Sequence, residues 1–183
     1  MAGHVNFFVV TGGPGSGKST LIAALAAQGF ATMPEAGRAV IRAQTAAGGS
    51  ALPATDPAAF AEAMLRMDIR SYRDAQDQDG VVFFDRGIPD VAGYLRLTGL
   101  SVPAHVYEAA SGLRYNRRVF IAPPWRDIFR QDAERKQDFA EAVRTAEAMR
   151  AIYRELGYEL MELPCAPVQA RVRFVTNAIA AAR

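Results

Sequence analysis

Short apolar runs alternate along this chain with longer stretches in which apolar residues recur at helical spacing. The runs predict five buried strands, at residues 7–10, 30–33, 81–85, 119–121 and 158–163. The longer stretches predict helices at residues 18–28, 39–47, 56–78, 90–98, 103–110, 139–156 and 168–182. In the third of these, Phe60, Met64, Met67 and Ser71 are spaced to share one face. This alternation predicts an α/β fold with three layers, a five-stranded parallel sheet with helices on both faces.

The loop after the first predicted strand carries the most specific motif. Gly12, Gly17, Lys18 and Ser19 complete the pattern G-x-x-x-x-G-K-[ST] of the phosphate-binding loop of P-loop NTP hydrolases. Glycines let backbone N–H groups converge on a phosphate, and the following helix adds its positive N-terminal end. We therefore expect a cofactor site for ATP that is formed by Gly12, Gly13, Pro14, Gly15, Ser16, Gly17, Lys18, Ser19 and Thr20.

Two of these residues have distinct expected roles. Lys18 is one of only two lysines in a chain that otherwise uses arginine, and its compact charge suits the β- and γ-phosphates. The hydroxyl of Ser19 suits a Mg²⁺ ion bound with the nucleotide. Asp85, which ends a strongly apolar strand, is the expected second metal residue. The alternative for Asp85 is a turn or a helix N-cap.

Composition limits the remaining possibilities. A length of 183 residues favours a single domain, residues 1–183. A net charge of +2 gives no reason to expect a nucleic-acid partner. The single cysteine excludes an internal disulfide, and no apolar run approaches the roughly 18 residues that cross a bilayer. The first residues lack the pattern of a signal peptide, so we expect a cytoplasmic protein with no membrane partner.

The residue after Asp85 distinguishes classes of P-loop protein. Motor ATPases usually place a water-activating glutamate there, whereas this chain has Arg86. An arginine suits an anionic substrate or the transferring phosphoryl group, or it is a surface residue paired with Asp90. The chain also lacks room for the helical lid domain of ring-forming ATPases, and it has no guanine-reading N-K-x-D. A kinase is therefore favoured over a motor or a GTPase switch.

The phosphate loop, the Phe-Phe-Asp-Arg turn at 83–86 and the arginine-rich segment 125–137 resemble the P-loop nucleoside and nucleotide kinase superfamily. Segments 34–38 and 83–90 are similar to a small bacterial group labelled "AAA family ATPase". That group resembles the ribosylnicotinamide kinase domain of NAD biosynthesis regulators and, more distantly, deoxynucleoside kinases. The resemblance implies that Glu35, after the second strand, is the base toward an acceptor hydroxyl, and that Asp85 and Arg86 form the acid–arginine pair. The aromatic residues with which those kinases hold a nucleobase have no clear counterpart here.

Several residues keep more than one interpretation. Glu35 is either the base or an acid in the first helical turn. Arg38 either holds an acceptor phosphate or pairs with Glu35. The region of about 123–137 resembles the mobile lid of the superfamily, which implies Arg130 and Arg135 as catalytic cations. Arg126, one helical turn before Arg130 on the same predicted face, is a further candidate for this role. The alternative is a solvated helix. The resemblance also implies that segment 164–167 adjoins adenine.

Taken together, the sequence favours an ATP- and Mg²⁺-dependent phosphotransferase whose acceptor is a small molecule, nucleoside- or nucleotide-like. Its expected catalytic residues are Lys18, Glu35, Asp85, Arg86, Arg130 and Arg135. The competing hypothesis is a nucleotide-dependent switch that hydrolyses ATP slowly and binds a protein partner.

Overall fold

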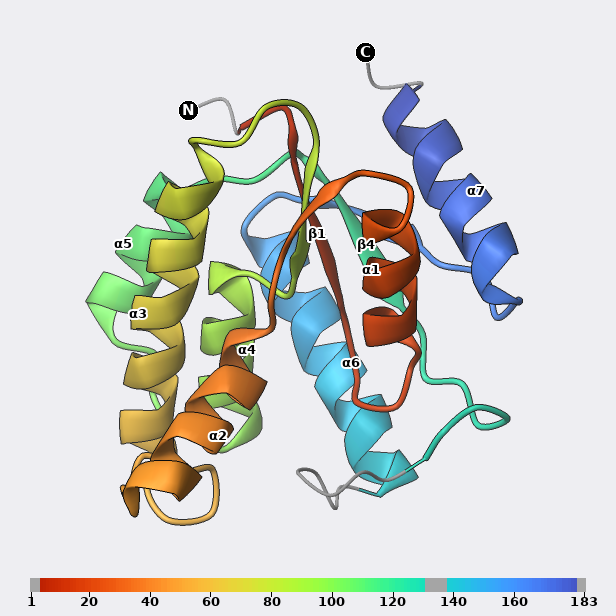
Figure 1. Cartoon of the computed structure of the whole chain (residues 1–183). Helices are drawn as coiled ribbons and strands as arrows, with labels where there is room; N and C mark the ends of the chain where they lie inside the picture. Colours follow the sequence, from red (N-terminus) through yellow and green to blue (C-terminus); the bar gives the residue numbers. More distant parts are fainter. Residues whose placement is uncertain (1–3, 131–137, 181–183) are drawn as a thin grey trace.

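The computed structural model describes residues 4–130 and 138–180. Strands and helices alternate almost throughout, as predicted (Figure 1). The strands are β1 (Phe7–Gly12), β2 (Ala31–Met33), β3 (Val82–Asp85), β4 (Arg118–Ala122) and β5 (Glu159–Glu162). The helices are α1 (Lys18–Ala26), α2 (Ala36–Ala47), α3 (Pro57–Ala75), α4 (Ile88–Leu97), α5 (Ala104–Gly112), α6 (Phe139–Glu155) and α7 (Val168–Ala180).

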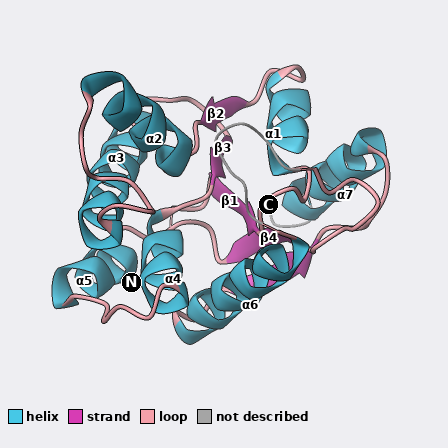
Figure 2. Ribbon diagram, turned by 90° about the horizontal axis from the view of Figure 1, so that it is seen from below, coloured by secondary structure: helices cyan, strands magenta, loops and turns pink. Residues whose placement is uncertain are grey.

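The five strands form one parallel sheet in the order β2-β3-β1-β4-β5. Alternate side chains of β1 point to opposite faces, as the pleat requires. Phe7 and Val9 pack against helices α2 to α6, whereas Phe8 and Val10 pack against α1 and α7. Figure 2 shows these two helical layers on either side of the sheet. The predicted three-layer fold with its five-stranded parallel sheet is therefore confirmed.

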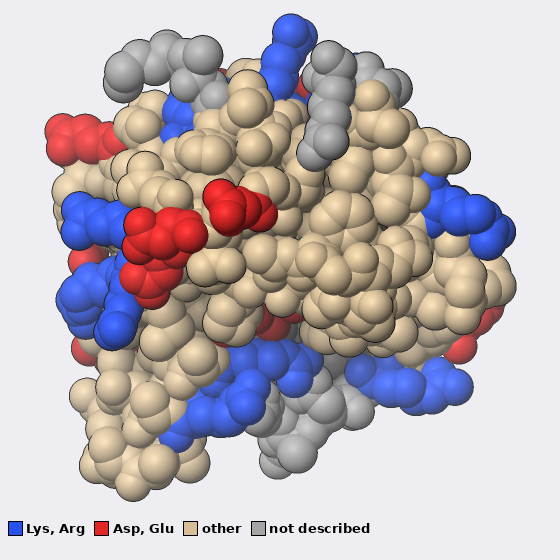
Figure 3. All heavy atoms as spheres, turned by 45° about the horizontal axis from the view of Figure 1, so that its top comes forward, with Lys and Arg blue, Asp and Glu red and all other residues tan. Residues whose placement is uncertain are grey.

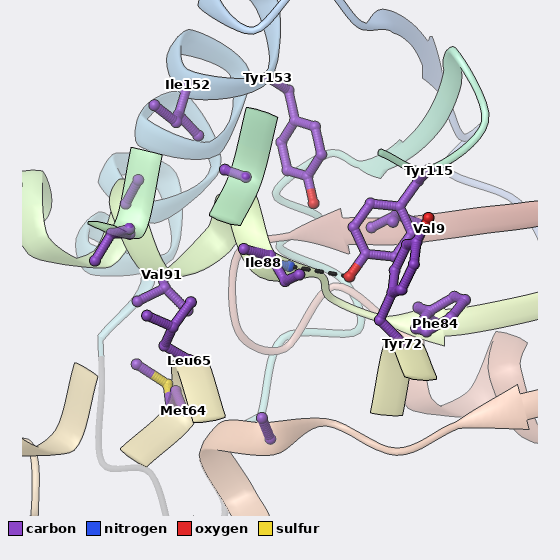
Figure 4. Packing of buried hydrophobic residues seen from close by; sticks show 14 of the residues in the cluster. Val9, Met64, Leu65, Tyr72, Phe84, Ile88, Val91, Tyr115, Ile152 and Tyr153 are labelled. Atoms are coloured by element: carbon purple, nitrogen blue, oxygen red, sulfur yellow. Dashed lines mark hydrogen bonds between the residues drawn. The ribbon is translucent and has the colours of Figure 1, made fainter. Parts of the chain in front are cut away.

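An aromatic cluster fixes the start of α4 within the larger core. The rings of Phe7, Tyr72, Phe84 and Tyr115 contact one another, most of them edge to face. The Tyr115 hydroxyl accepts a hydrogen bond of 3.2 Å from the Ile88 backbone N–H (Figure 4). Because that N–H lies in the first turn of α4, the contact satisfies a donor that the helix itself leaves unpaired.

Most element boundaries agree with the sequence analysis to within two or three residues. Helix α4 begins at Ile88 rather than at residue 90, because Gly87 is its N-cap and Pro89 occupies its first turn. Helix α2 begins at Ala36, three residues earlier than predicted. Residues 126–128 form a turn, so in the described part of the lid the predicted helical relation of Arg126 to Arg130 is wrong.

Two expectations concern surfaces. Among the helices of residues 4–130 and 138–180, none is long and apolar enough to span a membrane. On the face seen in Figure 3, basic side chains of the described residues lie in separate groups rather than in one continuous tract. The expected absence of a nucleic-acid partner stays a prediction.

Candidate active site at the carboxyl edge of the sheet

The phosphate loop connects β1 to α1 and has the backbone conformation that its glycines allow. Gly12 has φ 134°, and a Cβ atom there would lie 2.4 Å from the carbonyl oxygen of Ala122. Gly15 and Gly17 have φ 67° and 78°, in the left-handed region. Alternation of such residues with ordinary ones turns successive N–H groups to one side, which makes a concavity for anions.

Side chains of the loop fold over its own backbone. The amine of Lys18, a buried residue, donates a 2.6 Å hydrogen bond to the carbonyl oxygen of Gly13. The Ser16 hydroxyl donates to the same oxygen at 2.8 Å. Lys18 is also the first residue of α1, so its charge adds to the positive end of that helix. The arrangement fits a polyphosphate at the place that the sequence predicts.

Asp85 ends β3 beside β1, where Val10 is its partner in the register. The Ser19 hydroxyl donates to the Asp85 carboxylate at 3.4 Å. A hydroxyl and a carboxylate are oxygen ligands, which Mg²⁺ prefers, and Mg²⁺ usually takes its other ligands from phosphate and water. Among the described residues there is no group of three or more His, Cys, Asp or Glu placed to hold a metal. Ser19 and Asp85 thus fit the metal role, which stays a prediction.

Arg86 connects two acidic residues beside the loop. Its Nε donates to Glu35 at 2.9 Å, and its Nη1 donates to Asp90 at 2.8 Å. The side chain is only 13% exposed, so the expectation of a surface arginine is wrong, although the pair with Asp90 is present. Burial opposes the charged form, but Glu35, Asp90 and Asp85 together raise the pKa of Arg86 above its ordinary value.

Asp90 has a larger structural role than the sequence indicated. Its carboxylate accepts hydrogen bonds from Thr11 Oγ1 at 2.6 Å, Arg86 Nη1 at 2.8 Å, Gly87 N at 3.1 Å and Tyr153 Oη at 2.7 Å. Burial and the neighbouring Asp90 raise the pKa of Tyr153 well above its ordinary value, so the phenol remains a donor. Asp90 therefore connects β1, α4 and α6 behind Arg86.

Glu35 follows β2 and is the N-cap residue of α2, although its side chain does not cap the helix. The buried carboxylate instead accepts from Arg86 and from Arg38 Nε at 3.2 Å. The pair of Arg38 with Glu35, one of the two expectations for Arg38, is thus present. Glu35 lies before the first helical turn rather than in it. Its role as a base stays a prediction.

Two hollows reach the phosphate loop. The first, of about 450 Å³, is lined by Pro14 of the loop and by Glu35, Arg86 and Asp90. Its remaining wall is mostly apolar and comes from α2, α3, α4 and α6. We call it the α3–α4 cavity. The second, of about 460 Å³, is lined by loop residues Gly15, Gly17 and Thr20, by the lid residues Trp125, Ile128 and Arg130, and by Ala166, Pro167, Val168 and Arg171 after β5. We call it the lid cavity.

The lid residues are divided between different contacts. Phe129 lies against Gly15, where an added Cβ would be 2.5 Å from its ring. Arg130 is exposed and lines the lid cavity. Arg126 instead lies over the ring of Phe139, 4.2 Å from its centroid. Arg135 lies outside the described residues, so its predicted role and that of Arg130 stay predictions.

Sequence reasoning missed several residues of these hollows. Asp68 of α3 is buried and lines the α3–α4 cavity, as do the aromatic residues Phe60 and Tyr94. The signal for Asp68 was a buried helical row at four-residue spacing, which continues from Phe60 and Met64 through Asp68 and Tyr72. The predicted face through Met67 and Ser71 is only partly buried.

Arg171 of α7 is a further residue that the sequence analysis did not name. It is 3% exposed, and its Nη1 donates to the carbonyl oxygen of Ser16 at 3.0 Å. Burial lowers the pKa of Arg171. Its only signal in the sequence is an arginine at an otherwise apolar helix position, between the predicted last strand and the chain end.

Comparison with known proteins identifies the family. A family model described as an AAA domain matches residues 7–171. The chain belongs to this family. No curated protein matches it. Among solved structures, deoxyadenosine kinase from M. mycoides with products dCMP and dCDP superposes with a TM-score of 0.67 at 13% identity, over 96% of this chain and 99% of that one.

A second solved structure supports the same fold. NadR protein in complex with NR superposes with a TM-score of 0.65 at 17% identity, over 96% of this chain. The superposition covers 51% of NadR, so the AAA-domain chain spans about half of that protein's length. Together with the family match, these structures confirm the predicted resemblance to P-loop nucleoside kinases and the P-loop kinase fold.

Proposed function

We propose that this AAA-domain protein is an ATP- and Mg²⁺-dependent phosphotransferase that acts on a small molecule with a hydroxyl group. The observation that carries the proposal is that the α3–α4 cavity and the lid cavity both reach the phosphate loop, one at Pro14 and the other at Gly15 and Gly17. A hydrolase needs one such hollow for its nucleotide. A second hollow with a carboxylate and a guanidinium at the loop suits a second substrate.

The lid cavity is the proposed site of the adenosine part of ATP. Backbone N–H groups of residues 12–18 and the Lys18 amine would hold the phosphates, and Arg130 would approach them from the lid. Ser19 and Asp85 would hold Mg²⁺, which when bound offsets charge on the phosphate oxygens. Trp125 and Pro167 offer flat apolar surfaces on which a purine would lie.

The α3–α4 cavity is the proposed acceptor site. Arg86 and Arg38 hold the Glu35 carboxylate, which would orient the acceptor hydroxyl and take its proton. The acceptor oxygen would form a bond to the γ-phosphorus as the bond to the β,γ-bridging oxygen breaks, releasing ADP. Asp90 would contribute indirectly, by fixing the second arm of the Arg86 guanidinium.

Nucleosides and nucleotides are the proposed acceptor class. The similar deoxyadenosine kinase was solved with dCMP and dCDP and separately with dATP, and NadR was solved with NR. The α3–α4 cavity has a size and an apolar wall that suit a heterocyclic ring, with Phe60 and Tyr94 at 5.3 Å and nearly perpendicular. We infer that Phe60 and Tyr94 would take the role of the nucleobase-holding aromatic residues, which have no clear counterpart in the sequence.

Acceptor-dependent turnover tests the proposal. The purified protein would be given ATP, Mg²⁺ and single compounds from a panel of nucleosides, nucleotides and unrelated alcohols. We expect ADP release to rise with a subset of them and mass spectrometry to show each product with one added phosphoryl group. Lys18→Ala should abolish that product. ADP release that no small molecule stimulates, but that a protein partner does, would instead support the nucleotide-dependent switch.

A further inference from the structure

Asp68 is a buried carboxyl group that has no hydrogen-bonding partner among the described residues. It lies in the middle of α3, 6% exposed, and lines the α3–α4 cavity. Among the hydrogen bonds and ion pairs of residues 4–130 and 138–180, none involves its side chain. Buried carboxyl groups normally have partners, because desolvation without one is costly. An unpartnered carboxyl in the wall of a cavity therefore suggests a group that binds a ligand.

The charges around Asp68 indicate which chemical group of a ligand would bind there. Burial, and then the carboxylates of Asp90 and Glu35, raise the pKa of Asp68 well above its ordinary value, with Arg86 acting in the opposite direction. The Arg86 guanidinium already binds both Glu35 and Asp90. The polar end of the cavity thus holds Asp68, Glu35 and Asp90 beside the guanidinium of Arg86, with Arg38 on the other oxygen of Glu35. Such surroundings favour a hydrogen-bond donor and disfavour another anion or a carbonyl oxygen.

The rest of the cavity wall indicates the shape of the ligand. The Tyr94 hydroxyl is buried without a partner in the described structure, and its ring lies against Phe60. The hydroxyls of Thr98 and Thr145, which also line the cavity, are already bonded to backbone carbonyl oxygens. Apolar side chains such as Met64 and Met149 make up much of the remainder. The cavity therefore combines apolar walls with two buried polar groups that have no partner among the described residues, Asp68 and Tyr94. The partly buried Glu141 and the exposed Arg144 also line it.

We propose that Asp68 determines which acceptor is bound, by accepting a hydrogen bond from an amino group on the acceptor's ring. The inference rests on the proposed function, since it assumes that the α3–α4 cavity holds the acceptor. An oxygen of Asp68 accepts from an amino group whether the carboxyl is protonated or ionised. An oxo group in the same place is bonded only by the protonated form and repelled by the carboxylate. The cavity thus selects amino-substituted over oxo-substituted rings.

Binding of paired compounds tests the assignment without requiring phosphoryl transfer. Between adenosine and inosine, and between cytidine and uridine, an oxo group replaces the amino group and the adjacent ring nitrogen gains a proton. Calorimetry would measure the affinity of each compound without ATP. At the alkaline end of the pH range, where Asp68 is ionised, we expect the amino member of each pair to bind at least about ten-fold more tightly, as a buried hydrogen bond to a charged group allows. In Asp68→Asn, whose amide both donates and accepts, the two members should bind within about two-fold.

Two further variants control the comparison. Asp68→Leu removes both the acceptor and the charge, so it should weaken binding of the amino compounds more than that of the oxo compounds. Glu62→Gln changes a partly exposed acid of the same helix that pairs with His105, and it should leave the preference unchanged. Circular dichroism spectra would establish that each variant is folded.

The pH dependence of the preference gives a readout that a merely structural residue would not change. As Asp68 loses its proton the carboxylate repels the oxo compounds, so the ratio of affinities should rise with pH, and in Asp68→Asn it should not. Other charged or titratable groups also lie near this region. Those that line the cavity are Glu35, Arg86, Asp90, Tyr94, Glu141 and Arg144, and Arg38, Asp85, Tyr115 and Tyr153 lie behind them. All of these residues are still present in Asp68→Asn, so a pH dependence that is lost in this variant requires Asp68.

The outcomes separate this inference from the proposed function. Equal affinities within both pairs, an unchanged preference in Asp68→Asn, or failure of all four compounds to bind would overturn the role of Asp68. An Asp68-dependent preference without any phosphorylated product would support the inference and remove the phosphotransferase. Product formation with no effect of Asp68 on the amino preference would support the phosphotransferase and overturn the role of Asp68.

Discussion

Removal of the Arg86 side chain tests whether its guanidinium compensates the buried charges of Glu35 and Asp90 at the carboxyl edge of the sheet. In Arg86→Ala, the buried carboxylates of Glu35 and Asp90 lose the contacts at 2.9 and 2.8 Å. Glu35 retains Arg38, and Asp90 retains its neutral donors. Breaking a buried pair by removing one partner usually costs about 3–5 kcal/mol, because a charge is left buried without compensation. We expect a loss in the free energy of unfolding within that range.

The backbone at Arg86 allows a second measurement from the same site. Its φ of 70° makes it the one non-glycine residue with positive φ in the described chain. For an L-residue this conformation costs roughly 1–2 kcal/mol, and glycine avoids that cost. Arg86→Gly loses the same guanidinium as Arg86→Ala but relieves the backbone. It should therefore be more stable than Arg86→Ala by about 1 kcal/mol, after allowance for the greater freedom of glycine in the unfolded chain.

Urea unfolding monitored by circular dichroism at pH 8 would measure these differences. Arg96→Ala is the control, since Arg96 pairs with Glu155 on the surface, where such pairs contribute about 0–1 kcal/mol. If Arg86→Ala lost no more than Arg96→Ala, Arg86 would not be the compensating charge.

Four further predictions address the proposed site. Gly12→Ala places a Cβ atom 2.4 Å from a backbone oxygen, so ADP binding measured by calorimetry should weaken at least about ten-fold, whereas Gly112→Ala meets no atom within 4 Å and should not change it. Asp85→Asn should raise the Mg²⁺ concentration needed for half-maximal turnover, and an unaltered Mg²⁺ titration would remove Asp85 from the metal site. Glu35→Gln should slow acceptor phosphorylation by about 100-fold or more, with little change in the affinity for ATP; a rate near that of the wild type would exclude it as the base. Asp68→Asn should raise the free energy of unfolding by an amount that grows with pH. The pKa of Asp68 is raised on folding, so the wild type loses stability as the pH rises above the ordinary aspartate pKa of about 4. A difference in the free energy of unfolding that stays constant with pH would contradict this.

The nucleotide side of the site was predictable because its parts are contiguous. The phosphate loop lies between one strand and the helix that follows it, so spacing alone predicts which residues would face a phosphate. Asp85 was predictable for a related reason, because it ends an apolar run and all parallel strands end at one edge. The contact of Ser19 with Asp85 joins these two local signals. The layers and the strand count followed from periodicity in the same way.

The proposed acceptor side was less predictable, because the wall of the α3–α4 cavity is assembled from α2, α3, α4, α6 and the loop between α2 and α3, most of which are distant in sequence. Sequence spacing identified Glu35 and Arg86 separately, but their contact at 2.9 Å depends on how β2 and β3 pair. The two expected roles of Arg38 could not be distinguished by sequence either, since both place its side chain near Glu35. The structure shows the pair of Arg38 with Glu35, at 3.2 Å.

Asp68 shows what kind of signal such a site leaves in a sequence. An amphipathic helix of the core normally carries apolar residues at every buried position, because an unpaired buried acid destabilises the fold. In α3 the buried row of Phe60, Met64 and Tyr72 contains an aspartate at its third position. This acid in an apolar row is the feature of the sequence that marks the α3–α4 cavity, whose other walls come from helices distant in sequence. Stability alone would favour an apolar residue there, and the proposed contact of Asp68 with a ligand would account for the aspartate.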